Sequence, residues 1–184
     1  LGTNRRWDTG SEKMREIIDS GELGSLQTLM SYSQGTLFNI DSHNFDLLLY
    51  LNSDKPISWA SAYLPDGDQM IDGGIVHEDP AGQGMFQFEN GVMAYSLVAD
   101  RGWEAICENG SLSCFGTAWK ICRETTVETF PRFEHTSNTS NLIKDLIHAL
   151  DTGEPTRGGV RVARNTTELL FAFIESHIRN GARV

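Results

Sequence analysis

Positive charge is scarce in this sequence, which has 15 Lys and Arg residues against 25 Asp and Glu residues and a formal net charge of −10. No cluster of Lys and Arg offers a track for phosphates, which excludes nucleic acid and anionic membranes as partners. No apolar run approaches the roughly 20 residues that span a bilayer, and there is no signal-peptide pattern. The chain starts at Leu1 without a Met. We therefore expect a cytoplasmic protein, and a piece of a longer one.

Cysteine is also scarce. The three residues Cys107, Cys114 and Cys122 form no Cys-x-x-Cys pair, and each lies in a strand-like segment. This pattern predicts buried thiols in a reducing compartment rather than disulfides or a zinc site. The run His77-Glu78-Asp79 has metal-ligand residue types, but no further site at metal-binding spacing accompanies it, so we expect no metal.

A dinucleotide fingerprint is missing as well. The sequence contains no Gly-x-Gly-x-x-Gly, and Gly82-Gln83-Gly84 lies between expected strands, whereas the fingerprint joins a strand to a helix. No alternating strand–helix–strand pattern is present either. We therefore expect no cofactor-binding residues in this chain.

The 184 residues that are present are 39% hydrophobic and 22% charged, which is typical of a globular protein with one substantial core. Apolar residues at helical spacing predict four helices. They cover residues 11–20, a segment starting at Ser42, a segment capped by Ser140 and stopped by Gly153, and residues 160–180.

Two turns predict the sheet. Asn90-Gly91 separates two alternating runs, which is the strongest short-range signal for a hairpin, and Asn109-Gly110 separates another two. Residues 57–64 add a further strand. Successive hairpins need no crossover helices, so the sheet should be mainly antiparallel. The expected fold class is α+β.

The segment of residues 35–51 is the centre of the candidate site. If Ser42 caps the helix, His43 lies in its first turn and Asp46 lies one turn later on the same face. The positive end of the helix dipole disfavours a charged imidazole, so His43 should be neutral near pH 7. Asp46 is placed to hold one ring nitrogen, and Asn39 adds a polar group just ahead. The alternative is that Asp46 only complements the dipole and His43 is an ordinary first-turn residue.

The same segment resembles the Gly…Asp-x-x-x-His-x-x-Asp-Leu-Leu stretch of the glucose-fructose oxidoreductase / inositol dehydrogenase (Gfo/Idh/MocA) family. The catalytic His of the family falls on His43, its preceding Asp falls on Asn39, and the Asp that follows falls on Asp46. Arg5-Arg6, with the helix and turn that follow, is similar to the family's domain junction. Without the upstream domain we expect this Arg pair to be solvated.

The resemblance covers almost the whole chain, as the C-terminal half of the family. It implies a large open-faced sheet with helices packed on one of its faces. It implies one substrate-binding and oligomerisation domain over residues 1–184, with the N-terminal NAD(P)-binding Rossmann domain outside this chain. In the whole protein, His43 would be the acid/base on the hydroxyl of a sugar, cyclitol or related polyol, Asn39 would orient the substrate, and Asp46 would support the site. NAD or NADP would serve the whole protein, and the chain alone would be inactive. Subunits would associate through the open sheet face, giving a homo-oligomer.

Two alternatives remain open. Asn39 is an amide and cannot act as a general base, so its departure from the family Asp leaves room for a binding module that has lost catalysis. The second alternative is a purely structural dimerisation domain, because an open sheet must cover its apolar face.

Overall fold

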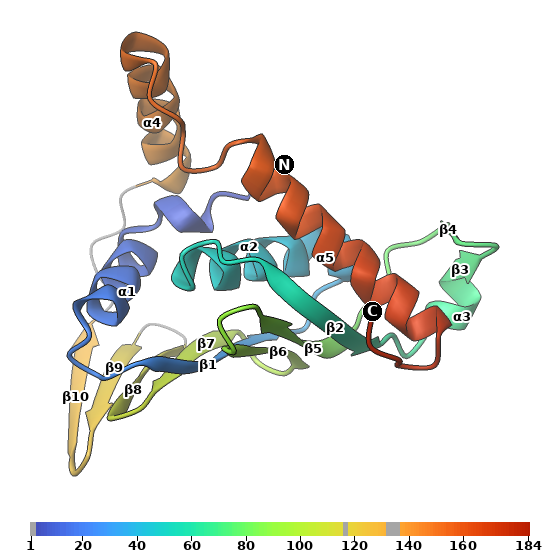
Figure 1. Ribbon diagram of the computed structural model, residues 1–184, viewed down its shortest axis with the longest axis horizontal. Coiled ribbons are helices and arrows are strands. Elements are labelled where there is room, and N and C mark those ends of the chain that lie inside the picture. The colour runs from blue at the N-terminus through green and yellow to red at the C-terminus, as the bar shows by residue number, and fades with distance from the viewer. Residues whose placement is uncertain (1–2, 116–117, 132–136) are drawn as a thin grey trace.

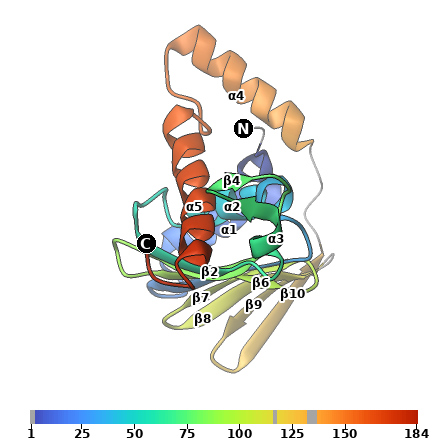
Figure 2. The ribbon, with the colours of Figure 1, turned by 90° about the vertical axis from the view of Figure 1, so that its right-hand side faces the viewer.

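The computed structural model describes residues 3–115, 118–131 and 137–184. One sheet of eight strands dominates it, and the helices lie on one face of that sheet (Figures 1 and 2). Its strands are β1 (Leu26–Ser33), β2 (Ile57–Tyr63), β5 (Gln83–Phe88), β6 (Met93–Val98), β7 (Gly102–Cys107), β8 (Gly110–Phe115), β9 (Ala118–Arg123) and β10 (Thr126–Pro131). A separate small hairpin consists of β3 (Ile71–Asp72) and β4 (Ile75–Val76).

The strand order is β10-β9-β8-β7-β1-β6-β5-β2. Each neighbouring pair is antiparallel except β1 with β6, which is parallel. The predicted hairpins join β5 to β6 and β7 to β8, and Gly91 takes the positive φ of 88° that its turn requires. The expected large, mainly antiparallel sheet with helices on one face is confirmed.

The helices are a 3₁₀ turn η1 (Arg5–Trp7), a π turn η2 (Leu37–Asp41), and α1 (Thr9–Ser20), α2 (Ser42–Leu51), α3 (Gly67–Met70), α4 (Asn138–Thr152) and α5 (Val160–Ile178). Ser137, not Ser140, caps α4, because its side chain accepts the Ser140 N–H. Similarly, α1 starts earlier than expected because Asp8 caps it. None of the described helices is both long enough and apolar enough to span a membrane.

The core lies between the sheet and the pair α2 and α5. The ring of Phe45 on α2 packs against Phe173 of α5 and Phe86 of β5, with centroid distances of 4.8 and 5.9 Å. Gly84 lets the Phe173 ring of α5 lie close to β5, because a Cβ at this position would meet the Ser61 carbonyl oxygen at 2.6 Å and the Phe173 ring at 2.8 Å. The apolar face of α2 thereby becomes a rigid support for the polar residues at its start.

The helix α4 stands away from this core (Figure 1). None of its residues is buried, and a stripe at helical spacing exposes Ile143, Leu146, Ile147 and Leu150. Its attachment is polar: Asn141 Nδ2 donates to the Trp7 carbonyl oxygen at 3.1 Å. An apolar stripe of this kind is typical of a helix that packs against another surface.

Candidate functional site

Asn39 and His43 lie on one continuous helical segment made of η2 and α2. The N–H groups of Ile40 and Asp41 both donate to the Thr36 carbonyl oxygen, at 2.9 and 3.1 Å. Ser42 has helical backbone angles, so the prediction that Ser42 caps this helix is wrong. The π turn starts the helical segment earlier in the chain. Such π turns occur frequently at functional sites.

His43 is half-buried. Burial lowers the pKa of its imidazole, the nearby Arg5 and Arg101 lower it further, and Asp46 opposes them. The expected neutral imidazole is therefore supported, although by burial and neighbouring guanidinium groups rather than by a free helix N-terminus. A neutral imidazole can accept a proton or donate one hydrogen bond.

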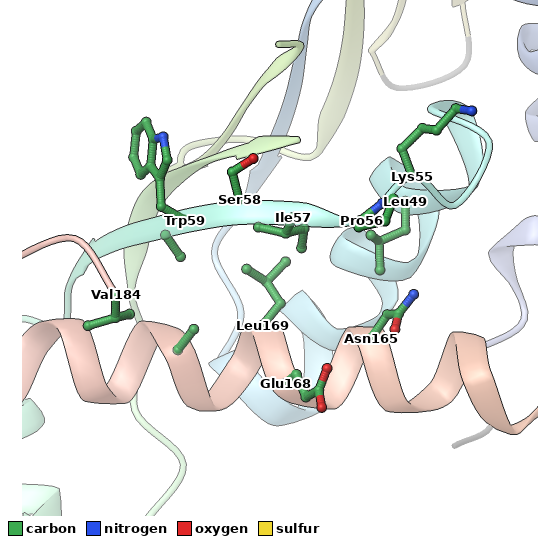
Figure 3. Close-up of a pocket in the computed structure, with 12 residues that line it drawn as sticks. Leu49, Lys55, Pro56, Ile57, Ser58, Trp59, Asn165, Glu168, Leu169 and Val184 are labelled. Carbon is green, nitrogen blue, oxygen red and sulfur yellow. The ribbon is translucent and has the colours of Figure 1, made fainter. Parts of the chain in front are cut away.

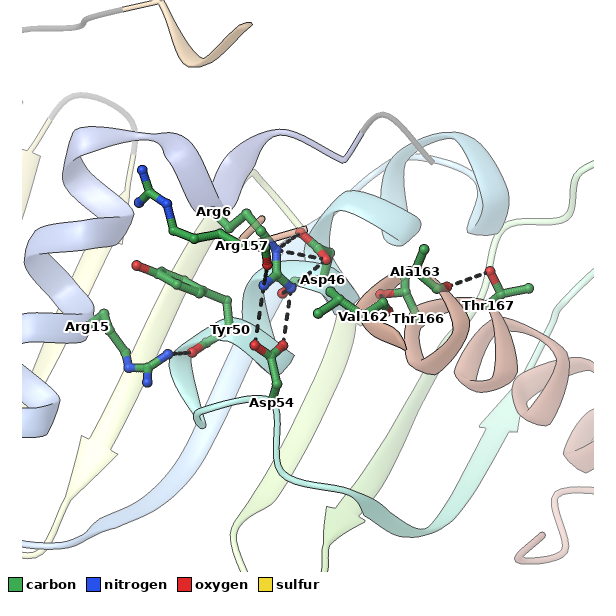
Figure 4. A network of polar contacts seen from close by, with 10 residues as sticks. All are labelled: Arg6, Arg15, Asp46, Tyr50, Asp54, Arg157, Val162, Ala163, Thr166 and Thr167. Carbon is green, nitrogen blue, oxygen red and sulfur yellow. Dashed lines mark hydrogen bonds and ion pairs between the residues drawn. The ribbon is translucent and has the colours of Figure 1, made fainter. Parts of the chain in front are cut away.

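Asp46 is held by Arg6, and within the described residues it forms no hydrogen bond with His43. The carboxylate accepts from Arg6 Nη2 at 2.7 Å and from Arg6 Nε at 3.0 Å (Figure 4). Both side chains are 1% exposed. Burial alone would lower the pKa of Arg6, but the hydrogen bonds with Asp46 and Asp54 raise it. Burial also raises the pKa of the Asp46 carboxyl, and the hydrogen bonds from Arg6 oppose that rise. The expectation that Asp46 fixes the His43 tautomer does not match these contacts.

Arg6 is the centre of a wider network. It also donates to both carboxylate oxygens of Asp54, at 3.2 and 3.3 Å, and to the Arg157 carbonyl oxygen at 2.9 Å (Figure 4). The expectation that Arg5 and Arg6 are solvated is wrong, because both are buried. The network ties the first described residues of the chain to α2 and to the loop before α5.

A second buried polar cluster lies under the candidate site. The Arg5 guanidinium donates to the Asn44 Oδ1, Asn44 Nδ2 donates to Asp41 at 2.9 Å, and Ser33 Oγ donates to the same carboxylate at 2.7 Å. Burial lowers the pKa of Arg5 to about 10, with Arg101 acting in the same direction. This guanidinium also lies 5.5 Å from the centroid of the Trp103 ring.

Asn39, the third predicted residue, is exposed. Its backbone N–H donates to Asp79 Oδ2 at 3.0 Å. This hydrogen bond fixes the backbone from which the Asn39 amide side chain projects. The structure thus brings Asn39 and His43 together on one helical segment and places Asp46 in the supporting network. Sequence reasoning did not assign Arg5, Asp41, Asn44, Asp79 or Arg101 to the site. A signal was present in Asp41, Asn44 and Asp46, which are polar residues on an otherwise apolar helical segment.

A groove of about 350 Å³ lies between β2 and α5 (Figure 3). Leu49, Ile57 and Leu169 provide apolar walls, and Lys55 and Glu168 lie at its rim. None of the three predicted site residues lines it. Val184 borders the groove, where it exchanges two backbone hydrogen bonds of 3.0 Å with Ala60.

No protein-family model and no curated protein matches the sequence, whereas many solved structures match the fold. The aldose-aldose oxidoreductase from Caulobacter crescentus, in complex with glycerol, has a TM-score of 0.82 and 14% identity, over 100% of this chain and 62% of that one. An oxidoreductase from Agrobacterium radiobacter in complex with NAD⁺, L-tartaric acid and magnesium has a TM-score of 0.79 and 13% identity, and the match covers 100% of this chain and 64% of that one. An NAD-binding protein from Listeria innocua has a TM-score of 0.76 and 17% identity, and the match covers 100% of this chain and 62% of that one.

The chain therefore has the fold of a domain that these three proteins share. This likeness confirms, at the level of the fold, the resemblance to the C-terminal domain of the Gfo/Idh/MocA family. The chain spans less than two thirds of the length of each of these three proteins, so the activity of a whole protein remains a matter for proposal.

Proposed function

We propose that the chain is the substrate-binding and oligomerisation domain of an NAD(P)-dependent oxidoreductase that acts on a sugar, cyclitol or related polyol. The observation that carries this proposal is His43, a half-buried imidazole whose pKa is lowered, at the start of a helix in an oxidoreductase fold. His43 would accept the proton of the hydroxyl group that is oxidised. Arg5 and Arg101 lie close enough to affect its charge, and they would stabilise negative charge that develops on the hydroxyl oxygen.

The cofactor belongs to the part of the protein outside these residues. The sequence lacks a glycine-rich turn between a strand and a helix, so the residues present do not fit a dinucleotide. NAD or NADP would bind an N-terminal Rossmann domain in the whole protein. The exposed stripe on α4 and the greater length of the solved relatives support a further domain.

The rival function is a binding module of the same fold that has lost catalysis. Asn39 favours this alternative, because an amide in place of a carboxylate cannot take a proton. The two functions share the polyol site and differ in whether the whole protein reduces a nicotinamide cofactor.

Polyol binding by the chain itself tests the shared part of the proposal. We expect myo-inositol, glycerol or an aldose to shift the NMR signals of the His43 ring in a saturable titration, because the hydroxyl would hydrogen-bond to the imidazole. His43→Ala should weaken binding by about tenfold, the effect of losing one good hydrogen bond. The groove between β2 and α5 provides the control: Lys55→Ala there should leave the affinity unchanged. A polyol that shifts no signal at His43 would argue against the proposal.

The open sheet face is the proposed subunit contact. On this face Tyr95 of β6 lies beside Met30 of β1 and Met85 of β5, and none of the described helices covers it (Figure 1). An apolar sheet face of this kind is normally covered, and a second copy can cover it with twofold symmetry.

A cytoplasmic location of the protein remains a prediction from the sequence.

Light scattering tests this contact. We expect the chain to have twice its 20.5 kDa mass in solution, as a dimer. The Tyr95→Glu variant should have the mass of a monomer, because the substitution buries an unpaired charge in the contact. Ile143→Lys on the α4 stripe is the matched control and should remain a dimer. A monomeric parent chain would refute association through the sheet.

A further inference from the structure

Asp79 contacts the segment that carries the candidate site, although it lies 40 residues further along the sequence than Asn39. Its Oδ1 accepts the Phe38 N–H at 2.8 Å. Its Oδ2 accepts the Asn39 N–H at 3.0 Å and the Thr36 hydroxyl at 2.5 Å. One carboxylate therefore holds three groups at the start of η2.

The residues that follow Asp79 reinforce this contact. The Leu37 N–H donates to the Pro80 carbonyl oxygen at 2.8 Å, and Thr36 forms a β-bridge with Ala81. The first N–H groups of a helical segment have no partner within it. Here they are satisfied by a distant loop, whereas α1 and α4 are capped by the residue that precedes them.

This contact also shapes the surface beside Asn39. A pocket of about 450 Å³ is lined by Asp79, Phe38 and Phe171, together with residues of the β3–β4 hairpin and His77 and Glu78. The Phe38 and Phe171 rings meet edge to face, with centroids 5.7 Å apart. The N–H of Phe38 that fixes this wall is one of the groups that Asp79 holds.

We propose that Asp79 is a positioning residue of the candidate site, and that its carboxylate fixes the turn that sets the places of Asn39 and His43. The proposal rests on the proposed function only in giving those two residues a substrate. It also assigns a role to Asp79, the last residue of the run His77-Glu78-Asp79. Among the described residues, no three His, Cys, Asp or Glu side chains are grouped as metal ligands.

Two variants test the positioning role through His43. Asp79→Asn keeps the size of the side chain but loses one acceptor and the charge, and Thr36→Val removes only the hydroxyl bond, with no change in charge. In each variant the turn should loosen and expose His43, so its NMR-measured pKa should move up towards the ordinary value of about 6.5. The amide signals of Phe38 and Asn39 should shift as well. Because Thr36→Val is isosteric and neutral, a change at His43 would report position rather than charge.

Asp8→Asn is the matched control, since Asp8 caps α1 through the Gly10 and Ser11 N–H groups and α1 carries none of the predicted site residues. It should lower the melting temperature but leave the pKa of His43 unchanged. If both test variants fold and His43 and Asn39 behave as in the parent chain, the proposal is overturned. If Asp79→Asn does not fold, Thr36→Val decides alone. Neither readout requires polyol binding, so the failure of the proposed function would be seen separately.

Discussion

Asp46→Ala is expected to lower the free energy of unfolding of this chain by about 3 kcal/mol, the lower end of the range for removing one partner of a buried ion pair. Arg6 and Asp46 are each 1% exposed, so the substitution leaves the Arg6 guanidinium buried without its main counter-charge. Asp54 still accepts from Arg6 at 3.2 Å, which limits the loss. Urea unfolding followed by circular dichroism measures the difference.

Asp54→Ala is the internal comparison for this prediction. Asp54 contacts the same guanidinium but its side chain is 31% exposed, so its loss should cost about 1 kcal/mol or less. Equal losses for the two variants, or a loss below about 1 kcal/mol for Asp46→Ala, would contradict the role given to the Arg6–Asp46 pair.

His43→Ala is expected to lower kcat of the whole protein by about 10²–10⁴-fold, the usual contribution of a positioned general acid or base. In the proposed function the imidazole of His43 takes the hydroxyl proton, since Asn39 cannot and Asp46 is occupied by Arg6. The rate of NAD(P)H formation at saturating polyol measures the effect.

His43→Gln should be as slow as His43→Ala, because glutamine keeps a hydrogen-bonding side chain but takes no proton.

Asn39→Asp separates the two candidate functions. In a working enzyme it should change the rate modestly, and in a protein that lost catalysis at this position it should create activity. A His43→Ala protein that keeps the parental kcat would remove His43 from the mechanism.

The sequence predicted well what short stretches determine. Asn90-Gly91 and Asn109-Gly110 marked the two hairpins correctly because a tight turn depends on the residues within it. The first predicted helix, over residues 11–20, ends at Ser20 as expected, and Gly21 after it has the left-handed φ of 72°. The expectation of a mainly antiparallel sheet followed from these local signals.

The errors concern contacts between distant residues. Arg5 and Arg6 were expected in solvent, yet their partners Asn44 and Asp46 lie about 40 residues away. Ser42 was expected to cap a helix that in fact begins in a π turn held by Asp79 from another loop. The parallel pairing of β1 with β6 likewise joins strands between which the whole chain from η2 to β5 lies. Local patterns carry no information on such partners.

The most direct test of the account is nicotinamide reduction by the whole encoded protein, compared with the 184-residue chain, across aldoses, inositols and acyclic polyols. We predict that the whole protein forms NADH or NADPH with at least one of these substrates, and that the chain alone forms none. Reduction by the chain alone, or a whole protein that has no nucleotide-binding segment and reduces neither cofactor, would contradict the assignment as the substrate domain of an oxidoreductase.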